Sequence, residues 1–305
     1  MKKKLLLTGA DGFIGRHSIK RLLNRGYEVH AISRDNRSFH EQAPNLLWHT
    51  CDLLDTNQQK SLVERIKPTH LLHFAWVTTP GEYWTSLENV RWIQTSLELL
   101  VNFINCGGKR VVFAGTCAEY DWDYDGYFSE ETTPLKPRTL YGASKKCLQE
   151  LFSVLCKQAS VSSAWGRIFF LYGPHENPRR LVPSVINSIE KGETARCTHG
   201  HQIRDFLFVE DAAFAFVDIL ECPVEGPVNI GSGQPVSLKS IVEFISGRLG
   251  HPELVEFGAI PVPEDDPQSL VADVSRLIKE VGWSPEYSLE QGLEETISWM
   301  MAKSC

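Results

Sequence analysis

The sequence predicts an α/β protein with a doubly wound parallel sheet and a smaller C-terminal lobe. Short apolar runs rich in Val, Ile, Leu and Phe alternate with amphipathic helical patterns through the first half of the chain, as expected for parallel strands joined by helical crossovers. A glycine-rich turn separates the first apolar run from the first helical pattern. After Gly173 the pattern changes to turn-rich loops and shorter helices, and no linker separates the two halves.

Each strand expected in the first half is an apolar run without polar alternation, which indicates that helices cover both faces of the sheet. The runs are residues 3–9, 27–33, 46–52, 69–75, 109–116 and 162–173. Helices are expected at 13–26, where Gly26 closes the pattern, at about 84–105 and at about 140–159. Strands and helices in this order build a doubly wound sheet.

The second half begins with a turn-rich loop at 174–180 and a short helix at 181–192. A strand edge leads into a helix at 206–221, and the stretch 227–237 introduces further helices that end with 288–302. We therefore expect a first domain over 1–173, to which a segment of about 205–232 returns. The smaller lobe takes most of 174–305 and is interleaved with that domain.

Composition and charge exclude several classes of protein. Of the 305 residues, 23% are charged and 42% hydrophobic, and the net charge is −7, which argues against nucleic acid and anionic membranes as partners. The apolar run near the start, residues 5–7, is too short for an export signal, and no stretch reaches the roughly 20 apolar residues of a membrane span. The eight cysteines form no C-x-x-C pair, so we expect reduced thiols in a cytoplasmic protein without a metal site.

The stretch "TGADGFIG", residues 8–15, carries the strongest signal. Gly9, Gly12 and Gly15 form the pattern G-x-x-G-x-x-G directly between the first strand and the first helix. Such a turn lets the backbone approach a pyrophosphate while the helix N-terminus presents N–H groups and a positive dipole. The sequence therefore predicts a dinucleotide-binding Rossmann domain over 1–173, with Asp11, Phe13 and Ile14 in the same turn.

The end of the second strand indicates which dinucleotide binds. A carboxylate there binds the ribose 2′-OH of NAD, whereas an arginine accommodates the 2′-phosphate of NADP. Ser33 stands at the carboxylate position and is followed by Arg34, with Arg37 close by. We expect NADP, although Asp35 leaves NAD open. In "CDLLD", Asp52 and Leu53 are expected to frame the adenine, or Asp52 to be a turn or helix-cap residue.

The stretch "YGASK" places Tyr141 and Lys145 one helical turn apart, on the same face. Together with "TGADGFIG" and with "FAGTCAEY" around Thr116, it resembles the extended branch of the short-chain dehydrogenase/reductases, the NAD(P)-dependent sugar-nucleotide epimerases, dehydratases and reductases. The resemblance covers nearly the whole chain. It includes "LYGP" at 171–174, "RDFLFVEDAA" at 204–213, "NIGSG" at 229–233 and "EVGWSPEYSLEQGL" at 280–293.

The resemblance implies roles for three catalytic residues. Tyr141 is expected to protonate the carbonyl oxygen as it is reduced, Lys145 to lower the pKa of Tyr141 and bind the nicotinamide ribose, and Thr116 to hydrogen-bond the same oxygen. Four further residues are expected on the nicotinamide side of the cofactor: Phe74, Ala75, Trp76 and Phe169.

Departures from the family pattern bear on the reaction. In the dehydratases of the family, Asp-Glu follows the catalytic threonine, but Cys117-Ala118 follows Thr116 here, which argues against dehydration. Glu119 is expected either to contact a sugar hydroxyl or to be a solvated loop carboxylate. Trp76, with Thr78 nearby as a substrate-binding candidate, suggests an altered substrate floor.

The smaller lobe is expected to bind the nucleotide part of the substrate. Arg204 matches an arginine that contacts the diphosphate, where a guanidinium suits bidentate binding. Arg179 and Arg180 lie in the preceding loop and are candidates to assist, although at least one of them is expected to lie on the solvated surface. The usual C-terminal arginine is absent, because residues 267–270 read "PQSL".

These observations predict an NADP-preferring reductase of a nucleotide-linked keto-sugar, in particular a 4-keto-6-deoxyhexose. Two alternatives stay open: a nucleotide-sugar epimerase with tightly bound NAD(P), and a non-catalytic NADP-binding regulator built on the same fold. By analogy with the family, the long helices at about 84–105 and 140–159 are expected to form a four-helix homodimer interface.

Overall fold

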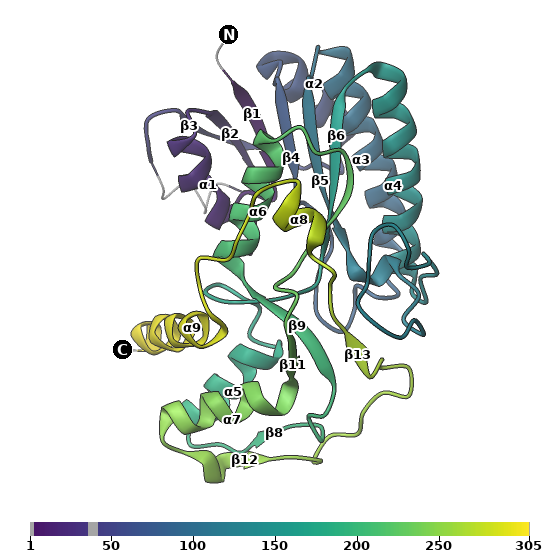
Figure 1. The fold of residues 1–305 in the computed structure, drawn as a ribbon. Helices are drawn as coiled ribbons and strands as arrows, with labels where there is room; N and C mark the ends of the chain where they lie inside the picture. The colour runs from purple at the N-terminus through teal and green to yellow at the C-terminus, as the bar shows by residue number, and fades with distance from the viewer. Residues whose placement is uncertain (1–2, 36–41, 305) are drawn as a thin grey trace.

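The computed structural model describes residues 3–35 and 42–304, and Figure 1 shows two layered regions. The larger contains a seven-stranded sheet in the order β10-β6-β5-β4-β1-β2-β3, in which every pairing is parallel. Its strands are β1 (Lys4–Thr8), β2 (Glu28–Ser33), β3 (Leu46–Thr50), β4 (His70–His73), β5 (Arg110–Thr116), β6 (Ser162–Ile168) and β10 (Gly226–Ile230). The predicted fold class, a doubly wound parallel sheet with a smaller C-terminal lobe, is confirmed.

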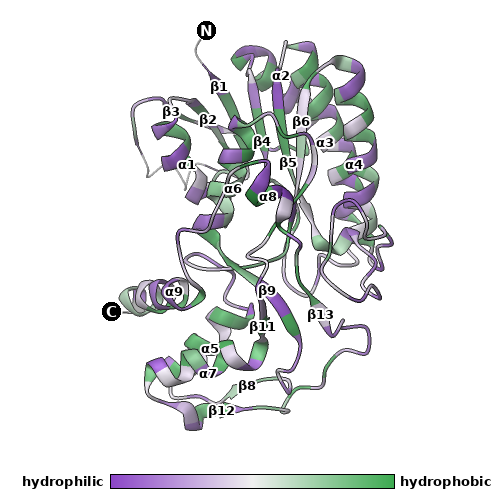
Figure 2. Cartoon of the chain, viewed as in Figure 1, coloured by the Kyte–Doolittle hydropathy of each residue, from purple (hydrophilic) through white to green (hydrophobic). Residues whose placement is uncertain are grey.

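Helices cover both faces of this sheet, which explains its uninterrupted apolar strands. Leu5 and Leu7 of β1 pack in the core on the face of α1 (Gly15–Asn24) and α6 (Val209–Glu221). Leu6, between them, packs in the core on the opposite face. That face is covered by α2 (Thr56–Ile66), α3 (Glu88–Asn105) and α4 (Leu140–Ala159). Figure 2 shows hydrophobic residues along β1 and β5 and mixed polarity on α3 and α4.

The smaller lobe is built around a four-stranded mixed sheet. β9 (Ile203–Phe208) lies at its centre, antiparallel to β11 (Pro235–Ser237) and parallel to β7 (Phe170–Tyr172) and β13 (Ser269–Leu270). The other elements are α5 (Leu181–Glu190), α7 (Leu238–Leu249), α8 (Ser275–Lys279), α9 (Leu289–Ser304), the pair β8 (Ala195–Arg196) and β12 (Val255–Glu256), and the 3-10 turns η2 (Cys117–Glu119) and η3 (Pro252–Leu254).

One element differs from the expectation. The stretch 162–173, expected as one strand, is divided at Phe169 into β6, in the large sheet, and β7, in the small sheet. The division follows from pairing: the Phe169 N–H donates to the Ile230 carbonyl, and the chain then turns onto β9. The stretch 227–237, expected to introduce further helices, contains most of β10 and also β11 and is followed directly by α7.

α6 and β10 belong to the stretch of about 205–232 and complete the layers of the large sheet. The two sheets therefore share one continuous path of the chain, from β9 through α6 to β10. Within the described residues, no helix has both the length and the apolar composition needed to cross a membrane.

Candidate active site

The glycine turn lies between β1 and α1 and is shaped by backbone contacts. A Cβ atom at Gly15 would lie 2.1 Å from the Gly9 carbonyl oxygen, and one at Gly9, whose φ is +64°, would lie 2.9 Å from the Ala75 nitrogen. Side chains at these positions would fill the turn and push it away from the end of β4. The α1 N-terminus opens onto this turn, so the turn fits the pyrophosphate of a dinucleotide. Phe13 and Ile14 are half-buried beside it.

The residues expected around the adenosine are arranged at the ends of β2 and β3. Ser33 is buried, and its hydroxyl donates to Asp11 Oδ2 at 2.7 Å, while Arg34 is exposed. Arg37 lies outside the described residues. Asp52 is exposed and accepts from the Leu54 N–H at 3.0 Å, which is the turn role left open above.

Leu53, expected beside the adenine, has its side chain packed in the core beneath α2 and α3, with 5% of its surface exposed. Its place beside the adenine stays a prediction. Phe169 is likewise 6% exposed and packs with Tyr120 and Phe128. Phe74 and Ala75 are half-buried at the end of β4, behind the glycine turn.

The structure brings Thr116, Tyr141 and Lys145 together. Thr116 ends β5, and the other two lie in the first turns of α4, whose first turn is capped by the Thr139 hydroxyl. The exposed fractions are 8% for Thr116, 9% for Tyr141 and 3% for Lys145. The Lys145 ammonium donates to the Ala114 carbonyl at 2.8 Å, so β5 fixes its position as well.

Burial is the largest cause of the pKa shifts of Tyr141 and Lys145. It raises the pKa of Tyr141 well above the ordinary value, with a further rise from Tyr83, while a hydrogen bond with Thr116 lowers it. Burial lowers the pKa of Lys145 to about 7, and the charge of Glu119 opposes that shift. The protein groups alone therefore do not give the expected lowering of the Tyr141 pKa, because the phenolate loses its hydration on burial.

Aromatic side chains surround the catalytic pair. The Lys145 ammonium lies 3.8 Å from the centre of the Trp76 ring, and the Trp76 indole N–H donates to Asn89 Oδ1 at 2.8 Å. Tyr83 packs edge-on against Tyr141, with ring centres 4.9 Å apart. Trp84 packs edge-on against the same ring at 5.8 Å. The segment "GEYW" at 81–84, an aromatic pair just before a long helix, is the signal that could have revealed Trp84.

The residues predicted to bind the substrate lie in different environments in the structure. Arg204 is 3% exposed and pairs with Asp266 at 2.6 Å. Arg179 is exposed and pairs with Glu82 at 3.7 Å, so its role at the substrate stays a prediction. Its neighbour Arg180 lies over the Tyr83 ring, 5.4 Å from the centre, and is the arginine on the side of Tyr141. Thr78 is exposed on the loop after β4.

The two roles expected for Glu119, a solvated loop carboxylate or a contact to a sugar hydroxyl, are both wrong. Its side chain is fully buried. One oxygen accepts from the Thr116 N–H and the Trp165 indole, and the other accepts from Arg167. Both oxygens are thus used inside the protein, since a carboxylate is buried only where it is paired.

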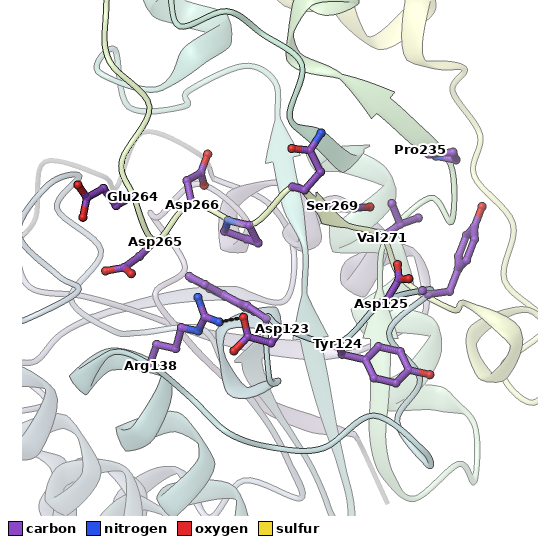
Figure 3. Close-up of a pocket in the computed structure, with 15 residues that line it drawn as sticks. Asp123, Tyr124, Asp125, Arg138, Pro235, Glu264, Asp265, Asp266, Ser269 and Val271 are labelled. Carbon is purple, nitrogen blue, oxygen red and sulfur yellow. Dashed lines mark ion pairs between the residues drawn. The ribbon is translucent and has the colours of Figure 1, made fainter.

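A cavity of about 490 Å³ opens between the loop after η2 and the segment that leads into β13. Figure 3 shows that carboxylates gather along it, with Arg138 paired to Asp123. The acidic lining residues are Asp123, Asp125, Glu264, Asp265 and Asp266. Such a lining repels a diphosphate, so the carboxylates must be offset or moved before an anionic substrate group enters here.

The loop after β7 reaches the glycine turn, a contact that the sequence did not indicate. The His17 ring lies 3.2 Å from the Pro174 carbonyl, and Arg16 contacts the His175 ring at 2.5 Å. Glu176, next in the loop, has one oxygen buried without a hydrogen-bond partner among the described residues, and burial raises its pKa to about 8. An orphaned buried carboxyl oxygen in this loop is a position that a ligand donor could fill.

Comparisons with known proteins identify the family of this chain. A model of the NAD dependent epimerase/dehydratase family matches residues 5–231. CDP-abequose synthase of Salmonella typhimurium is 26% identical over 305 residues, covering 97% of this chain and 98% of that protein. The dTDP-4-dehydro-6-deoxyglucose reductase of Escherichia coli is 24% identical, covering 99% of each chain. Other relatives at similar identity are named as decarboxylases.

Solved structures share the whole fold. The crystal structure of UDP-glucose 4-epimerase from Thermotoga maritima, with UDP-glucose, has a TM-score of 0.88 to this structure. It covers 99% of this chain and 100% of its own, at 22% identity. The arrangement of the large sheet and the smaller lobe is therefore shared across that length.

Proposed function

Because the chain belongs to the NAD dependent epimerase/dehydratase family, we propose that it is an NADP-preferring reductase of a nucleotide-linked keto-sugar, a 4-keto-6-deoxyhexose. Membership makes it an NAD(P)-dependent enzyme that acts on sugar nucleotides, as the resemblance in the sequence implied. The observation that carries the proposal is the buried set of Thr116, Tyr141 and Lys145 beside the glycine turn.

The geometry supports a simple reduction. A reduced nicotinamide bound at the glycine turn would supply the hydride to the carbonyl carbon. The Tyr141 hydroxyl donates its proton to the carbonyl oxygen, and the Thr116 hydroxyl hydrogen-bonds the same oxygen, so the product is a secondary alcohol. Lys145, held by the Ala114 carbonyl, places a cation where the phenolate forms.

Two features favour reduction over the other reactions of the family. Cys117 and Ala118 follow Thr116 and are both buried, so no carboxylate stands there for the elimination of water. The reductase from Escherichia coli matches this chain over nearly its entire length, and its name specifies a 4-dehydro-6-deoxy sugar. The aromatic wall of Tyr83 and Trp84 suits the apolar face of a sugar that lacks a hydroxyl.

The stoichiometry of the cofactor tests this proposal. With a 4-keto-6-deoxy sugar nucleotide, we expect NADPH to be consumed mole for mole, followed as loss of nicotinamide absorbance together with product analysis. Ordinary hexose nucleotides should not be interconverted without added cofactor. Inversion of such a sugar with no net change in NADPH would establish the epimerase instead. Binding of NADPH with no turnover of any keto-sugar would establish the regulator.

The cofactor preference is tested at the end of β2. Arg34 is exposed there and Ser33 is buried, so we expect tighter binding of NADPH than of NADH. Arg34→Ala should weaken NADPH by about 1.5–3 kcal/mol, the scale of a charge-assisted hydrogen bond, with little effect on NADH. Titration calorimetry measures both affinities, and Arg248→Ala, an exposed arginine of α7, is the control. Equal affinities in the unmodified protein would assign the ribose to a carboxylate such as Asp35.

Entry of the diphosphate is tested at Asp266. The Asp266 carboxylate forms an ion pair with Arg204 at 2.6 Å and accepts a hydrogen bond from Gln202 at 3.1 Å. A substrate phosphate that binds Arg204 must therefore displace this carboxylate. Asp266→Asn should lower KM for the nucleotide sugar by about 3- to 10-fold, roughly 1 kcal/mol, with kcat nearly unchanged. Asp265→Asn, an exposed neighbour in the same segment that does not pair with Arg204, should lower KM by less than Asp266→Asn does. A raised KM for Asp266→Asn would mean that the pair itself holds the site together.

Homodimer formation is proposed through α3 and α4, which pack side by side. Their outer faces expose apolar side chains, namely Leu87, Val90 and Val101 at α3 and Leu151 and Val154 on α4. Exposed rows of this kind mark interfaces between chains. The mass of the purified protein in solution, by analytical ultracentrifugation, decides between monomer and dimer.

A further inference from the structure

Glu119 is a buried carboxylate three positions after the catalytic Thr116, at the end of the 3-10 turn η2. It is 0% exposed, and its partner Arg167 is 1% exposed. Arg167 Nε donates to Glu119 Oε2 at 2.7 Å, while the Thr116 N–H donates to Oε1 at 2.9 Å. The Trp165 indole N–H donates to the same Oε1 at 2.9 Å. The carboxylate thus joins the backbone of Thr116 to the neighbouring strand β6.

Two glycines make room for this arrangement. A Cβ at Gly115 would lie 2.7 Å from Glu119 Oε1 and 2.0 Å from the Trp165 indole nitrogen. A Cβ at Gly142, in the first turn of α4, would lie 2.2 Å from the Ala118 carbonyl oxygen. The turn is therefore packed tightly between β5 and α4, so its position sets the distance between the residues that those elements carry.

The partner Arg167 is itself held by hydrogen bonds. Its Nη1 donates to the Tyr120 hydroxyl at 3.1 Å, and that hydroxyl donates to Asn229 Oδ1 at 2.8 Å. The Asn229 amide donates in turn to the Phe128 carbonyl at 2.6 Å. A buried polar network with every member paired is rigid, so the Glu119 carboxylate has one position.

Glu119 also acts on Lys145 by its charge. Lys145 is buried, and within the described residues Glu119 is the carboxylate that raises its pKa against the effect of burial. His73 of β4 faces the same ammonium, but burial lowers its pKa to about 3, so the imidazole is neutral at working pH. Trp76 meets the ammonium through its ring alone.

The charge of Glu119 also affects the pKa of Tyr141. Burial, Tyr83, Cys117 and Glu119 all raise its pKa, and the hydrogen bond with Thr116 lowers it. Burial raises the pKa of the Cys117 thiol to about 12, so that thiol carries no charge. The carboxylate of Glu119 is then the fixed negative charge that both catalytic residues share.

We infer that Glu119 is a positioning residue: it fixes Thr116 at the reacting carbonyl and places a negative charge that favours the ammonium form of Lys145 beside Tyr141. This role rests on the proposed function of those three residues. It differs from the two roles expected from the sequence, because the carboxylate works from inside the protein and contacts no ligand.

Glu119→Gln is the decisive variant, since it removes the charge and keeps the shape. The pKa values of Tyr141 and Lys145 should both fall, because a negative neighbour raises them. The limb of the pH–rate profile above neutrality should move to lower pH by roughly one unit. We expect kcat to fall by about tenfold or more with KM for the sugar nucleotide nearly unchanged. A wild-type pH profile in a folded, less stable Glu119→Gln protein would overturn the inference.

Two further variants separate charge from structure. Trp165→Phe removes a neutral donor from the same oxygen, so it should lower stability without moving the pH profile. Glu119→Asp keeps the charge but withdraws it from Thr116, so kcat should fall while the profile stays in place. If Glu119→Gln does not fold, Glu119→Asp decides: a wild-type kcat overturns the inference, and a loss of at least about tenfold supports it.

A measurement without substrate keeps this test distinct from the proposed function. The side-chain nitrogen of Lys145 can be titrated by NMR in lysine-labelled protein, with its signal assigned by its loss in Lys145→Met. In Glu119→Gln the Lys145 midpoint should be lower than in the wild type. An unchanged midpoint overturns the charge role even if the keto-sugar is reduced, and a lowered midpoint supports it even if another sugar proves to be the substrate.

Discussion

Tyr141→Phe should reduce the rate of keto-sugar reduction by about 10²- to 10⁴-fold, the contribution of a positioned general acid. The substitution removes the hydroxyl that donates the proton and keeps the ring that packs against Tyr83 and Trp84. Affinity for NADPH should therefore stay within about twofold, since the aromatic wall is intact. Single-turnover kinetics with saturating NADPH, alongside equilibrium titration of the cofactor, separate the two effects.

The high pKa of Tyr141 adds a pH dependence to this experiment. Burial keeps the phenol protonated in the protein without ligands, which is the form that a general acid needs. The phenol itself should thus not limit reduction below alkaline pH, and the wild-type rate should decline as the Lys145 ammonium, with a pKa of about 7, loses its proton. Tyr287→Phe, which removes a hydroxyl that reaches Glu210 at 3.3 Å, is the matched control and should be fully active. A rate above about one tenth of wild type in Tyr141→Phe would mean that another group is the acid.

Local sequence patterns predicted most of the large sheet well, because its central strands are apolar runs covered on both faces, whereas β3 is an edge strand with Leu47 exposed. Leu5, Leu6 and Leu7 show the reason: alternate residues enter two different cores. β10 lacks such a run, since Pro227 and Asn229 interrupt it. Its place in the sheet depends on β6, more than fifty residues earlier in the chain, and no local pattern contains that information.

The candidate site could be predicted where its residues follow a motif and not where distant residues pair. Tyr141 and Lys145 share one helical turn, so their spacing alone places them together. Glu119 was misplaced because its burial depends on Arg167, 48 positions later. The pairing of Arg204 with Asp266 spans 62 positions. A single sequence gives no indication that charged residues so far apart in the chain pair with each other.

Lys145→Met should abolish turnover and stabilise the ligand-free protein in the same variant. The lysine holds its ammonium in a site that lowers its pKa to about 7, so burial of the charge costs folding free energy. An unbranched apolar side chain of similar length removes that cost, and we expect a gain on the order of 2–4 kcal/mol near neutral pH. Activity should fall by at least about 10²-fold, because the cation beside Tyr141 is lost.

The pH dependence gives this last prediction its sign. Lys145 has a pKa of about 7 in the folded state and an ordinary pKa in the unfolded state. At pH values below both pKa values it is protonated in both states, and its burial then lowers the stability of the folded protein by the full amount. The penalty is relieved as pH rises from about 7 toward roughly 10.4. The advantage of Lys145→Met in urea unfolding should therefore be largest near about pH 6 and shrink by about pH 9. Lys146→Met, the adjacent lysine paired to Glu150 at 3.0 Å, should change stability by under about 0.5 kcal/mol at either pH. An advantage for Lys145→Met that is the same at both pH values would show that packing, and not the buried charge, sets the stability of this position.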